Sequence, residues 1–387
     1  MSRRRFGGLF VAVVLLVCLI GAVVAYVILA RQVNLAAVIS PAEEAQVQVP
    51  EGFAVNVFAS GLSAPRFITF GPDEQLYVAE RGAGRIVRLP DVDGNGAADE
   101  VEIVAGDLES PHSVVIHEGD WFVGVPTGVV RLGDRDGDGA AENREIIVSD
   151  YPTSGHNTRT VLFLPDGQMV VSVGSSCNVC EEEDPRRAAI VAYDGPAGQS
   201  ERIFASGLRN AVGLTLQPET GELWASNNGR DFMGDDLPPE TIYRLREGVD
   251  YGWPSCHSGD IPDPEFGIEG ACDSVPEPEV EMQAHSAPLG LTFYDGESFP
   301  AAYHGDLFVA FHGSWNRSVP TGYSVVRIPF ADGEVAGAVE DFATGWLNRE
   351  TNAVDGRPVG LAVGPDGALY VSDDKGGFIY RIYYTGG

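Results

Sequence analysis

The sequence predicts an all-β fold, a six-bladed β-propeller preceded by one transmembrane helix, and three observations support this prediction. A phrase of the form strand, tight turn, strand occurs six times, at intervals of about 45–75 residues. Helical periodicity is nearly absent after residue 31, and an uninterrupted apolar run lies before it. Repeats of this size that consist of short strands are typical of propellers. The alternative, a two-sheet sandwich, would not account for six copies.

The apolar run covers residues 9–30 and follows three arginines at positions 3–5. Its 22 residues, at about 1.5 Å each, match the roughly 30 Å hydrocarbon core of a bilayer and exceed the core of a cleaved signal peptide. Because flanking arginines stay in the cytoplasm, residues 1–31 are expected to be a signal anchor, a single-pass helix in the cell membrane with the rest of the chain on the extracytoplasmic side. Cleavage near residues 23–25 is the alternative.

The remaining chain divides into a linker, residues 32–49, and one propeller domain, residues 50–387. In each repeat of that domain, apolar and β-branched residues flank a turn of the P-D-G type, which predicts a β-hairpin. The clear copies are FGPDEQLYVAE from Phe70, FLPDGQMVVSV from Phe163, LQPETGELWAS from Leu216 and VGPDGALYVSD from Val363. The weaker copies are VIHEGDWFVGV from Val115 and FYDGESFPAAYHGDLFVAF from Phe293.

A second phrase precedes each hairpin, for example SGLSAPR, SGLRNAV or GRPVGL. Because the innermost strand of each propeller blade lines the central channel, the polar residues of this phrase are expected at the channel mouth. Arginines gathered there would create a local positive field and would suit a ligand with several carboxylates. The alternative is that each arginine pairs with a carboxylate of a neighbouring blade. The residues expected at the mouth are Arg66, His112, His156, Asn157, Arg159, Arg209, Asn210, His285, Ser286 and Arg357.

The net negative charge of the chain limits which classes of ligand are expected to bind. The chain has 56 acidic and 25 basic residues, which give a formal charge of −31. A nucleic-acid partner is excluded because phosphate contacts need a basic face. An anionic small molecule is expected only where the arginines gather.

Seven segments of the domain form a specific set: SGHNTRTVLFLPDG at 154–167, VGSSCNVCEEEDPRRAAI at 173–190, SGLRNAVGLTLQPETGELWASNNGRDFMGDDL at 206–237, REGVDYGWP at 246–254, HSAPLGLTFY at 285–294, HGSWNR at 312–317 and GRPVGLAVGPDGALYVSDD at 356–374. Over about residues 50–385, this set resembles the quinoprotein glucose/sorbosone dehydrogenase family, whose members use pyrroloquinoline quinone (PQQ). The similarity is closest to the sorbosone-dehydrogenase-like branch.

The resemblance implies that PQQ lies over the channel mouth and that a sugar hemiacetal or alcohol is oxidised. It implies that a histidine takes the hydroxyl proton while hydride moves to a quinone carbon, and His156 matches that histidine. A neutral imidazole is the form that this base requires. The implied substrate is a small-molecule sugar. Because the sequence has no haem motif, the electrons would pass to an external acceptor, a quinone or a cytochrome.

The resemblance also assigns cofactor and metal contacts. Arg209 and Asn210 match an R-N pair. Arg209 would stabilise charge on the reduced quinone, and Asn210 would hydrogen-bond a quinone oxygen or a group on the calcium side. Gly229 and Arg230 match positions whose backbone carbonyls hold a Ca²⁺ ion beside the quinone. Arg357 matches an arginine that clamps the carboxylates of the cofactor.

Four positions depart from the family pattern. Ser175 stands where the family has an aspartate that orients the histidine base, and Gly155 replaces another aspartate just before that histidine. His312 stands at the position of a cofactor-facing lysine, and we expect it to face the cofactor instead, since the only lysine of the chain is Lys375. Val359 replaces a second clamping arginine, so the acid groups of the cofactor lose two expected cations.

Four of the five cysteines follow the predicted anchor, as the local pairs Cys177 with Cys180 and Cys256 with Cys272. An even number in an oxidising compartment predicts two disulfides. Zinc binding is the alternative, but it would need two CxxC pairs and the chain has one.

Two segments match the calcium-loop pattern D-x-[DN]-x-[DN]-G-x5-E. Because no amphipathic helices flank them, we expect both loops to close β-hairpins on the rim of the propeller. They would either bind Ca²⁺ in a structural role or form acidic turns without metal. The ligand positions are Asp91, Asp93, Asn95 and Glu102 in the first loop, and Asp134, Asp136, Asp138 and Glu145 in the second.

Together these features predict a membrane-anchored, extracytoplasmic sugar dehydrogenase with PQQ and Ca²⁺ as cofactors. Two alternatives stay open. A propeller that has lost its cofactor and binds carbohydrate or protein would fit the departures at Ser175, His312 and Val359. A calcium-dependent, lactonase-like hydrolase would need Asp, Asn and Glu side chains in the channel, whereas this mouth is rich in arginine and histidine.

Overall fold

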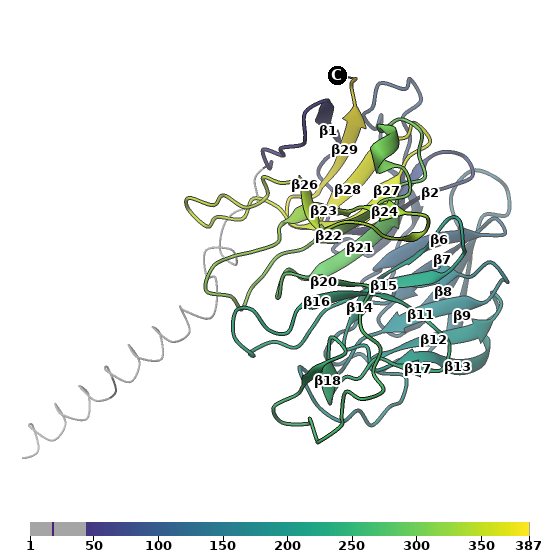
Figure 1. Ribbon diagram of the computed structural model, residues 1–387. Coiled ribbons are helices and arrows are strands. Elements are labelled where there is room, and N and C mark those ends of the chain that lie inside the picture. Colours follow the sequence, from purple (N-terminus) through teal and green to yellow (C-terminus); the bar gives the residue numbers. More distant parts are fainter. Residues whose placement is uncertain (1–17, 19–43, 387) are drawn as a thin grey trace, which may run out of the picture.

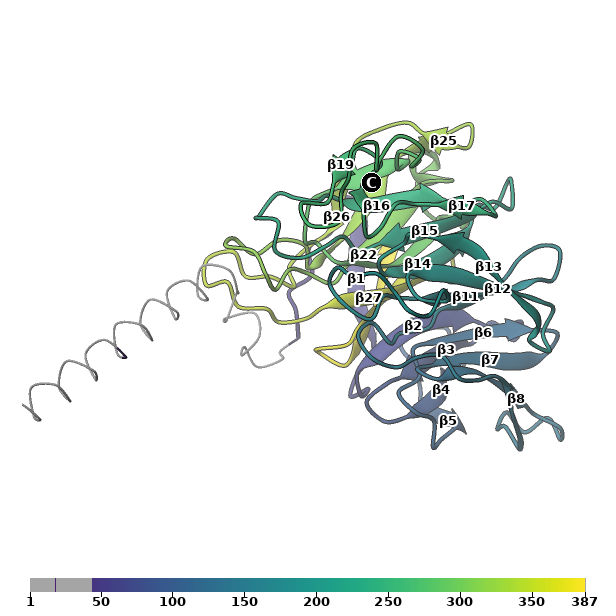
Figure 2. The ribbon, with the colours of Figure 1, turned by 90° about the horizontal axis from the view of Figure 1, so that it is seen from below.

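The innermost strands of six mainly antiparallel sheets contact one another in a ring. The sheets follow one another around it in chain order (Figures 1 and 2). This computed structural model describes residues 44–386 together with Cys18. Within these residues the predicted six-bladed β-propeller is confirmed. Apart from Cys18, the predicted anchor and the linker up to residue 43 lie outside the described residues. No helix in the described part of the chain is long and apolar enough to cross a membrane.

Each of the first three blades begins with the strand that lines the channel and proceeds outward. Blade 1 consists of β2 (Pro65–Phe70), β3 (Leu76–Glu80), β4 (Arg85–Leu89) and β5 (Glu102–Ala105). Blade 2 consists of β6 (Ser113–His117), β7 (Asp120–Val125), β8 (Gly128–Gly133) and β9 (Asn143–Val148). Blade 3 consists of β10 (Val161–Phe163), β11 (Met169–Val173), β12 (Ala189–Asp194) and β13 (Gln199–Ser206), with β17 (Val249–Asp250) parallel to β13 at its edge.

Blades 4 and 5 follow the same order and carry longer insertions. Blade 4 consists of β14 (Ala211–Leu216), β15 (Leu223–Asn227), β16 (Glu240–Arg244) and β20 (Val280–Met282), with the ribbon β18 (Cys256–His257) and β19 (Ile261–Pro262) between its third and fourth strands. Blade 5 consists of β21 (Pro288–Phe293), β22 (Leu307–Phe311), β23 (Ser324–Ile328) and β26 (Glu340–Ala343). Its insertions are the 3-10 turn η1 (Ala301–Tyr303) and the ribbon β24 (Phe330–Ala331) with β25 (Glu334–Val335).

Blade 6 closes the ring with strands from both ends of the described chain. Its inner three strands are β27 (Pro358–Val363), β28 (Leu369–Asp373) and β29 (Phe378–Tyr384), and β1 (Phe53–Ala59) pairs antiparallel with β29 as the outer strand. The inner strand β27 contacts β2 on one side and β21 on the other. Residues 44–49, the described end of the predicted linker, run along this closure, where Gln48 forms a bridge with Thr344.

The six repeated phrases are confirmed as the hairpins between the two inner strands of each blade. Neighbouring inner strands approach closely where the second phrase carries glycine. A Cβ on Gly213 would lie 2.0 Å from the carbonyl oxygen of Leu289, and a Cβ on Gly290 would lie 2.4 Å from that of Val359. The recurring V-G-L or L-G-L therefore reflects close packing of strands around the channel.

The hydrophobic core lies between neighbouring blades. Tyr77 and Ile86 of blade 1, for example, pack in one cluster with Val114 and Trp121 of blade 2. Burial of such faces stabilises the ring by about 25 cal/mol per Å² of apolar surface. The polar connections are left at the two ends of the channel, where functional groups can gather without disturbing the core.

Candidate active site

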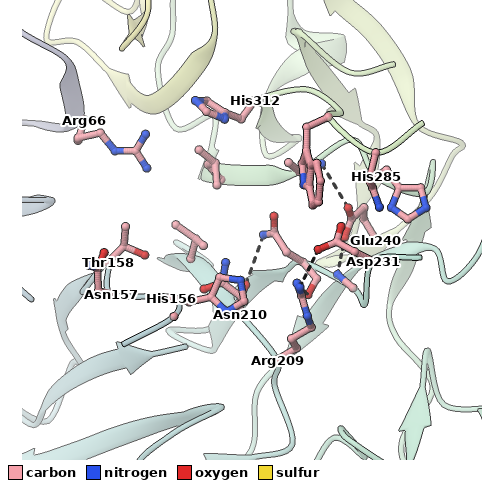
Figure 3. A pocket seen from close by; sticks show the side chains of 18 residues that line it. Arg66, His156, Asn157, Thr158, Arg209, Asn210, Asp231, Glu240, His285 and His312 are labelled. Atoms are coloured by element: carbon pink, nitrogen blue, oxygen red, sulfur yellow. Dashed lines mark hydrogen bonds and ion pairs between the residues drawn. The ribbon is translucent and has the colours of Figure 1, made fainter. Parts of the chain in front are cut away.

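The loops that precede the inner strands and the loops that follow the second strands meet at one end of the channel, because consecutive strands of a blade run antiparallel. A cavity of about 310 Å³ opens between these loops. Figure 3 shows the side chains that line it, and we take it as the candidate active site. The labelled side chains are Arg66, His156, Asn157, Thr158, Arg209, Asn210, Asp231, Glu240, His285 and His312.

Most residues that the second phrase places at the mouth do line this cavity. They are Arg66, His156, Asn157, Arg209, Asn210 and His285. Gly229 and His312, which were assigned from the family resemblance, line it as well. The remaining expected residues do not form part of the lining: His112, Arg159, Ser286, Arg230 and Arg357.

His156 is held through one ring nitrogen. Its Nδ1 lies 2.9 Å from the Oγ of Ser175 and 3.1 Å from the carbonyl oxygen of the same residue, on the β11–β12 loop. The Ser175 hydroxyl donates to the carbonyl of Cys177 at 2.7 Å, so toward the ring its oxygen can only accept. Since both Ser175 oxygens accept, the proton of the neutral imidazole resides on Nδ1.

The other ring nitrogen, Nε2, is therefore unprotonated, and it has no hydrogen-bond partner among the described residues. Burial lowers the pKa of His156 to about 4, and the positive charges of Arg209, Arg187 and Arg159 act in the same direction. The hydrogen bond with Ser175 partly opposes them. At neutral pH the ring is uncharged, which is the form that accepts a proton.

Two glycines shape the backbone around this histidine. A Cβ on Gly174 would lie 2.6 Å from the Cβ of His156 and 2.5 Å from the Oδ1 of Asn210, so glycine allows these two side chains to lie side by side. Gly155 has a φ of +65°, and a Cβ there would lie 2.3 Å from the carbonyl oxygen of Ser176. The aspartate of the family pattern at position 155 does not fit this backbone.

Two buried arginines hold the loop that carries His156. Arg159 donates to the carbonyls of Pro152 at 2.8 Å and of His156 at 3.1 Å. Arg187 donates to the carbonyl of Gly174 at 3.0 Å and to that of His156 at 3.3 Å. The expectation that Arg159 faces the channel mouth is wrong, because its guanidinium instead supplies donors to buried backbone oxygens.

Arg209 is fixed by polar contacts with Asn178 and Asp231. Its Nε donates to the Asn178 carbonyl at 3.0 Å, and its Nη2 donates to the Asn178 Oδ1 at 2.9 Å and to Asp231 Oδ2 at 3.0 Å. The Asn178 Oδ1 also accepts from the backbone N–H of Asp231 at 2.8 Å. Asn178 thus connects the β11–β12 loop with the β15–β16 loop on the cavity wall.

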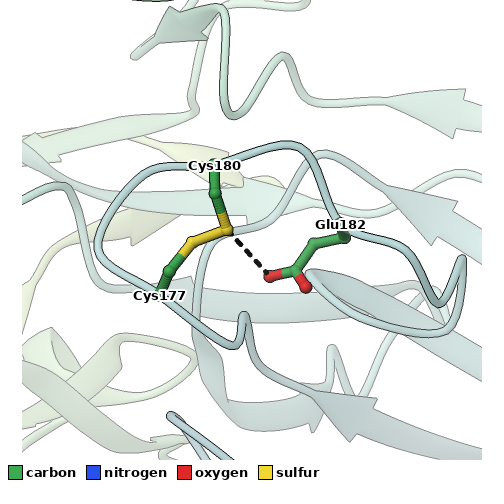
Figure 4. Close-up of side chains that lie close together, drawn as sticks. All are labelled: Cys177, Cys180 and Glu182. Carbon is green, nitrogen blue, oxygen red and sulfur yellow. Dashed lines mark hydrogen bonds between the residues drawn. A yellow bond between two sulfur atoms is a disulfide. The ribbon is translucent and has the colours of Figure 1, made fainter.

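Both predicted disulfides are confirmed. Cys177–Cys180 closes the short loop that carries Asn178, and the carboxylate of Glu182 lies 3.9 Å from the Sγ of Cys180 (Figure 4). Cys256–Cys272 closes the insertion of blade 4. The first disulfide therefore stabilises a loop that contacts two residues of the cavity wall.

Asp374, which the sequence analysis missed, links cavity residues from both sides of the ring closure. It pairs with Arg66 of blade 1 and accepts from the Nε2–H of His312 of blade 5 at 2.9 Å. Burial alone would raise the pKa of Asp374, but the hydrogen bond from His312 and the charge of Arg66 outweigh burial and hold the pKa far below its usual value. Burial lowers the pKa of His312. A neutral ring therefore occupies the position of the family's lysine, and that cation is not replaced.

The positive charge of the arginines expected at the channel mouth is partly neutralised. Arg66 and Arg209 each have a carboxylate partner, as in the alternative considered from the sequence. Arg357 differs from them: its guanidinium lies over the ring of Tyr323, 5.5 Å from the centroid, and has no carboxylate partner among the described residues. It also lies close enough to lower the pKa of His312. Arg357 is thus a cation near His312, outside the cavity lining, whose charge no carboxylate among the described residues neutralises.

An apolar floor closes the cavity toward the channel. Val212 and Leu289 line the cavity and pack with the fully buried Val359. The position of the second clamping arginine is therefore part of this floor, and the chain has no cation there.

Glu240 is a second carboxyl group that the sequence analysis missed. It lies at the start of β16, lines the cavity, and accepts from the backbone N–H of Gly229 at 2.6 Å and of Ala287 at 3.3 Å. Burial raises the pKa of Glu240 to about 7. No local pattern distinguishes Glu240 from the many surface acids, because its burial depends on contacts with the neighbouring blade.

The predicted calcium contact beside the cofactor involves the backbone of Gly229 and Arg230. Gly229 lies on the cavity wall. The side chain of Arg230 is directed toward the insertion of blade 4, where it pairs with Asp263 and Glu265. The carbonyl contacts of these two residues stay a prediction.

The two predicted calcium loops do not line the cavity, and a different residue completes each acidic cluster. In the first loop, carboxylate oxygens of Asp91, Asp93 and Asp99 lie within 4.8 Å of one another. Glu102 is not part of this cluster, because it lies on β5 and pairs with Arg88. Ca²⁺ binding by the loop stays a prediction.

In the second loop, the cluster consists of Asp134, Asp136, Asp138 and Glu142. Glu145 lies on β9, outside the cluster. In both loops the turn leads directly into a strand, which carries the last residue of the motif away from the earlier ligands. The acid three residues before it lies in the cluster instead, Asp99 in place of Glu102 and Glu142 in place of Glu145.

Comparisons with known proteins identify the family and the fold. The chain matches the TrAA12-like family over residues 47–258 and 267–385. A pyrroloquinoline quinone-dependent pyranose dehydrogenase of Coprinopsis cinerea is 28% identical over 89% of this chain and 55% of the relative. The chain thus spans about half the length of that curated relative.

Two solved structures share the fold. The holo form of the PQQ domain of pyranose dehydrogenase from Coprinopsis cinerea has a TM-score of 0.77 at 25% identity, covering 90% of this chain and 99% of that one. A calcium structure of the Trichoderma reesei Carbohydrate-Active Enzymes Family AA12 protein has a TM-score of 0.76 at 24% identity, covering 91% and 99%. The predicted resemblance to the quinoprotein sugar dehydrogenases is confirmed, and the chain belongs to the TrAA12-like family.

Proposed function

We propose that this protein is a PQQ-dependent sugar dehydrogenase in which His156 removes the proton of the hydroxyl group that is oxidised. The observation that carries this proposal is the neutral imidazole on the cavity wall, with Nδ1 held by Ser175 and Nε2 unprotonated. A general base must present such an atom to its substrate. The similarity to a pyrroloquinoline quinone-dependent pyranose dehydrogenase supports the same class of reaction.

The residues at the cavity fit a flat quinone with several carboxylates. Arg357 offers a guanidinium without a carboxylate partner among the described residues, and Asn210 lies beside the base. Val212 and Leu289 provide an apolar floor. These residues, together with a Ca²⁺ ion at the backbone of Gly229, would hold the cofactor. When bound, PQQ supplies the two-electron acceptor of the reaction.

His156 carries out the proton transfer. Its Nε2 accepts the hydroxyl proton, and the resulting imidazolium continues to donate from Nδ1 to Ser175. Burial and the charge of Arg209 disfavour the imidazolium, so the base stays unprotonated between turnovers. The low pKa makes His156 a weak base that remains available in mildly acidic solution.

We further propose that the cavity faces the extracytoplasmic side of the cell membrane, with residues 1–31 as a single-pass anchor. The apolar run after three arginines supports the anchor, and disulfides are typical of oxidising compartments. An external quinone or cytochrome would then accept the electrons.

A cofactor-free propeller that binds carbohydrate is the second candidate. One observation favours it: the ring of His312 is hydrogen-bonded to Asp374 and brings no charge to the place of the family's lysine. The two candidates differ in whether the protein binds PQQ at all.

Reconstitution of the full-length protein with PQQ and Ca²⁺ tests the proposal. We expect saturable PQQ binding by calorimetry and PQQ-dependent dye reduction with at least one pyranose from a panel of aldoses. Absence of PQQ binding would contradict the proposal and favour the cofactor-free propeller. Lactone hydrolysis with Ca²⁺ alone, without dye reduction, would instead identify a hydrolase.

A further inference from the structure

Asn316 presents a buried and unpaired amide to the cavity. The residue is 6% exposed and lines the cavity. Neither its Oδ1 nor its Nδ2 has a hydrogen-bond partner among the described residues. Two other amides on the wall have partners: Asn157 accepts from Arg81, and Asn228 donates to the carbonyl of Pro288. Because buried polar atoms in folded proteins are nearly always paired, this exception indicates that a ligand completes the pairing.

The loop between β22 and β23 fixes the position of this residue. On one side of it, the backbone N–H of Ser314 donates to the carbonyl of Thr321 at 3.0 Å. On the other side, the guanidinium of Arg317 donates to the carbonyls of Asp235 at 2.8 Å and of Ala284 at 3.2 Å. The amide therefore reaches the cavity from a backbone that is held in advance of binding, which lowers the entropic cost of recognising a ligand.

The chemistry of an amide limits which ligand can complete the pairing. Asn316 offers one acceptor and one donor group side by side. Carboxylates and quinone carbonyls only accept hydrogen bonds, so these groups of the cofactor would leave Oδ1 unpaired, and only its pyrrole N–H could donate to it. Hydroxyl groups both donate and accept, and two adjacent hydroxyls of a sugar ring can satisfy both atoms at once. This conclusion holds for either orientation of the amide, since both atoms are unpaired.

We propose that Asn316 is a specificity-determining residue that recognises a pair of adjacent hydroxyls that are not themselves oxidised. The inference rests on the proposed function and extends it, because it assigns substrate recognition to blade 5, whereas the base His156 comes from blade 3. The substrate class it selects is a cyclic polyol with a vicinal diol, in preference to simple alcohols.

The aromatic residue that precedes Asn316 supports a ring-shaped substrate. Trp315 also lines the cavity and is 41% exposed. It packs edge to face against Phe232, which is 58% exposed, with 5.4 Å between the ring centroids. Exposed aromatic rings provide an apolar surface for the C–H face of a sugar. The ring contact and the hydroxyl contacts would thus come from the same loop.

A comparison of parent and deoxy substrates tests this inference with the PQQ-loaded, full-length enzyme. For the wild type, removing one recognised hydroxyl from a pyranose substrate should raise KM about tenfold or more. Asn316→Ala should raise KM for the parent sugar by a similar factor and show no further loss with that deoxy analogue. Asn143→Ala, at an exposed position of β9, is the control and should match the wild type with every sugar.

Calorimetry gives a readout that is independent of turnover. Asn316→Ala should bind PQQ like the wild type but bind the parent sugar more weakly. The inference would be overturned if wild type and variant showed the same ratio of affinities for the parent and deoxy sugars. It would also be overturned if the variant lost affinity for PQQ while its affinity for the sugar was unchanged. If the wild type binds PQQ and sugar but oxidises none, the proposed function fails, and the sugar titration alone decides whether Asn316 recognises hydroxyls.

Discussion

The imidazole Nδ1 of His156 lies 2.9 Å from the Oγ of Ser175, whose own proton is donated to the carbonyl of Cys177. This relationship fixes the tautomer of the ring without a carboxylate. The pKa of His156 falls to about 4 because the ring is buried near the charge of Arg209, and the hydrogen bond with Ser175 opposes this fall only in part. Ser175 thus orients the imidazole as an aspartate would, but it adds no negative charge beside the ring.

Ser175→Asp should raise the pKa of His156 by roughly 1–3 units, because a carboxylate beside Nδ1 stabilises the imidazolium. NMR titration of the imidazole in the cofactor-free protein measures this shift directly. The acid limb of the kcat/KM profile should move to higher pH by the same amount, since protonated His156 is not a base. Ser175→Asn, a neutral side chain of similar size, is the matched control. A pKa that is unchanged in Ser175→Asp would show that position 175 does not control the base.

Two variants, each lacking one disulfide, should differ in opposite ways in their free energy of unfolding and in their affinity for PQQ. Cys256 and Cys272 are 16 positions apart, and replacing both with serine should cost about 3 kcal/mol of unfolding free energy. The same change at Cys177 and Cys180, three positions apart, should cost less because the closed loop is shorter. It should nevertheless weaken PQQ binding more, because Asn178 in that loop holds Arg209.

Urea denaturation and calorimetric PQQ titration of the two double variants test this contrast, and each variant serves as the control for the other. Equal PQQ affinity in both would contradict the role assigned to the short disulfide loop.

Asp374→Asn should destabilise the fold, because it leaves the buried guanidinium of Arg66 without its carboxylate and weakens the bond to His312. Breaking a buried pair from one side costs roughly 3–5 kcal/mol, and the partial exposure of Asp374 places the expected loss toward the lower end. Asp194→Asn, which removes the exposed partner of Arg202, should cost less than about 1 kcal/mol. Equilibrium urea denaturation measures both, and similar small losses would show that Asp374 is not needed at the closure of the ring.

The blades and most of the cavity wall could be predicted because both depend on a repeated local pattern. A phrase of this kind precedes each hairpin, so the place of His156 or Arg209 in the phrase already predicts that it lies at the channel mouth. Arg159 belongs to the same phrase as His156 but faces inward, because nearby buried carbonyls accept hydrogen bonds from its guanidinium. The repeat predicts where the backbone of a residue lies in the fold, but it does not predict which neighbours the side chain contacts.

Residues contributed by irregular loops could not be predicted in this way. Asp374 and Glu240 acquire their roles from neighbouring blades, and no local signal marks them among the 56 acidic residues of the chain. In the calcium loops the following strands carry Glu102 and Glu145 away from the clusters, and the spacing of the motif alone does not show this. Asn316 is distinguished only by its lack of hydrogen-bond partners among the described residues, which a sequence does not reveal.

The claim that His156 takes the substrate proton is tested most directly by single-turnover absorbance measurements of PQQ reduction in His156→Ala, after calorimetry has shown that the variant binds PQQ. Because general-base catalysis contributes about 10²–10⁴-fold, the rate of reduction by a pyranose should fall by that factor while PQQ affinity is retained. Reduction at the wild-type rate would contradict the account.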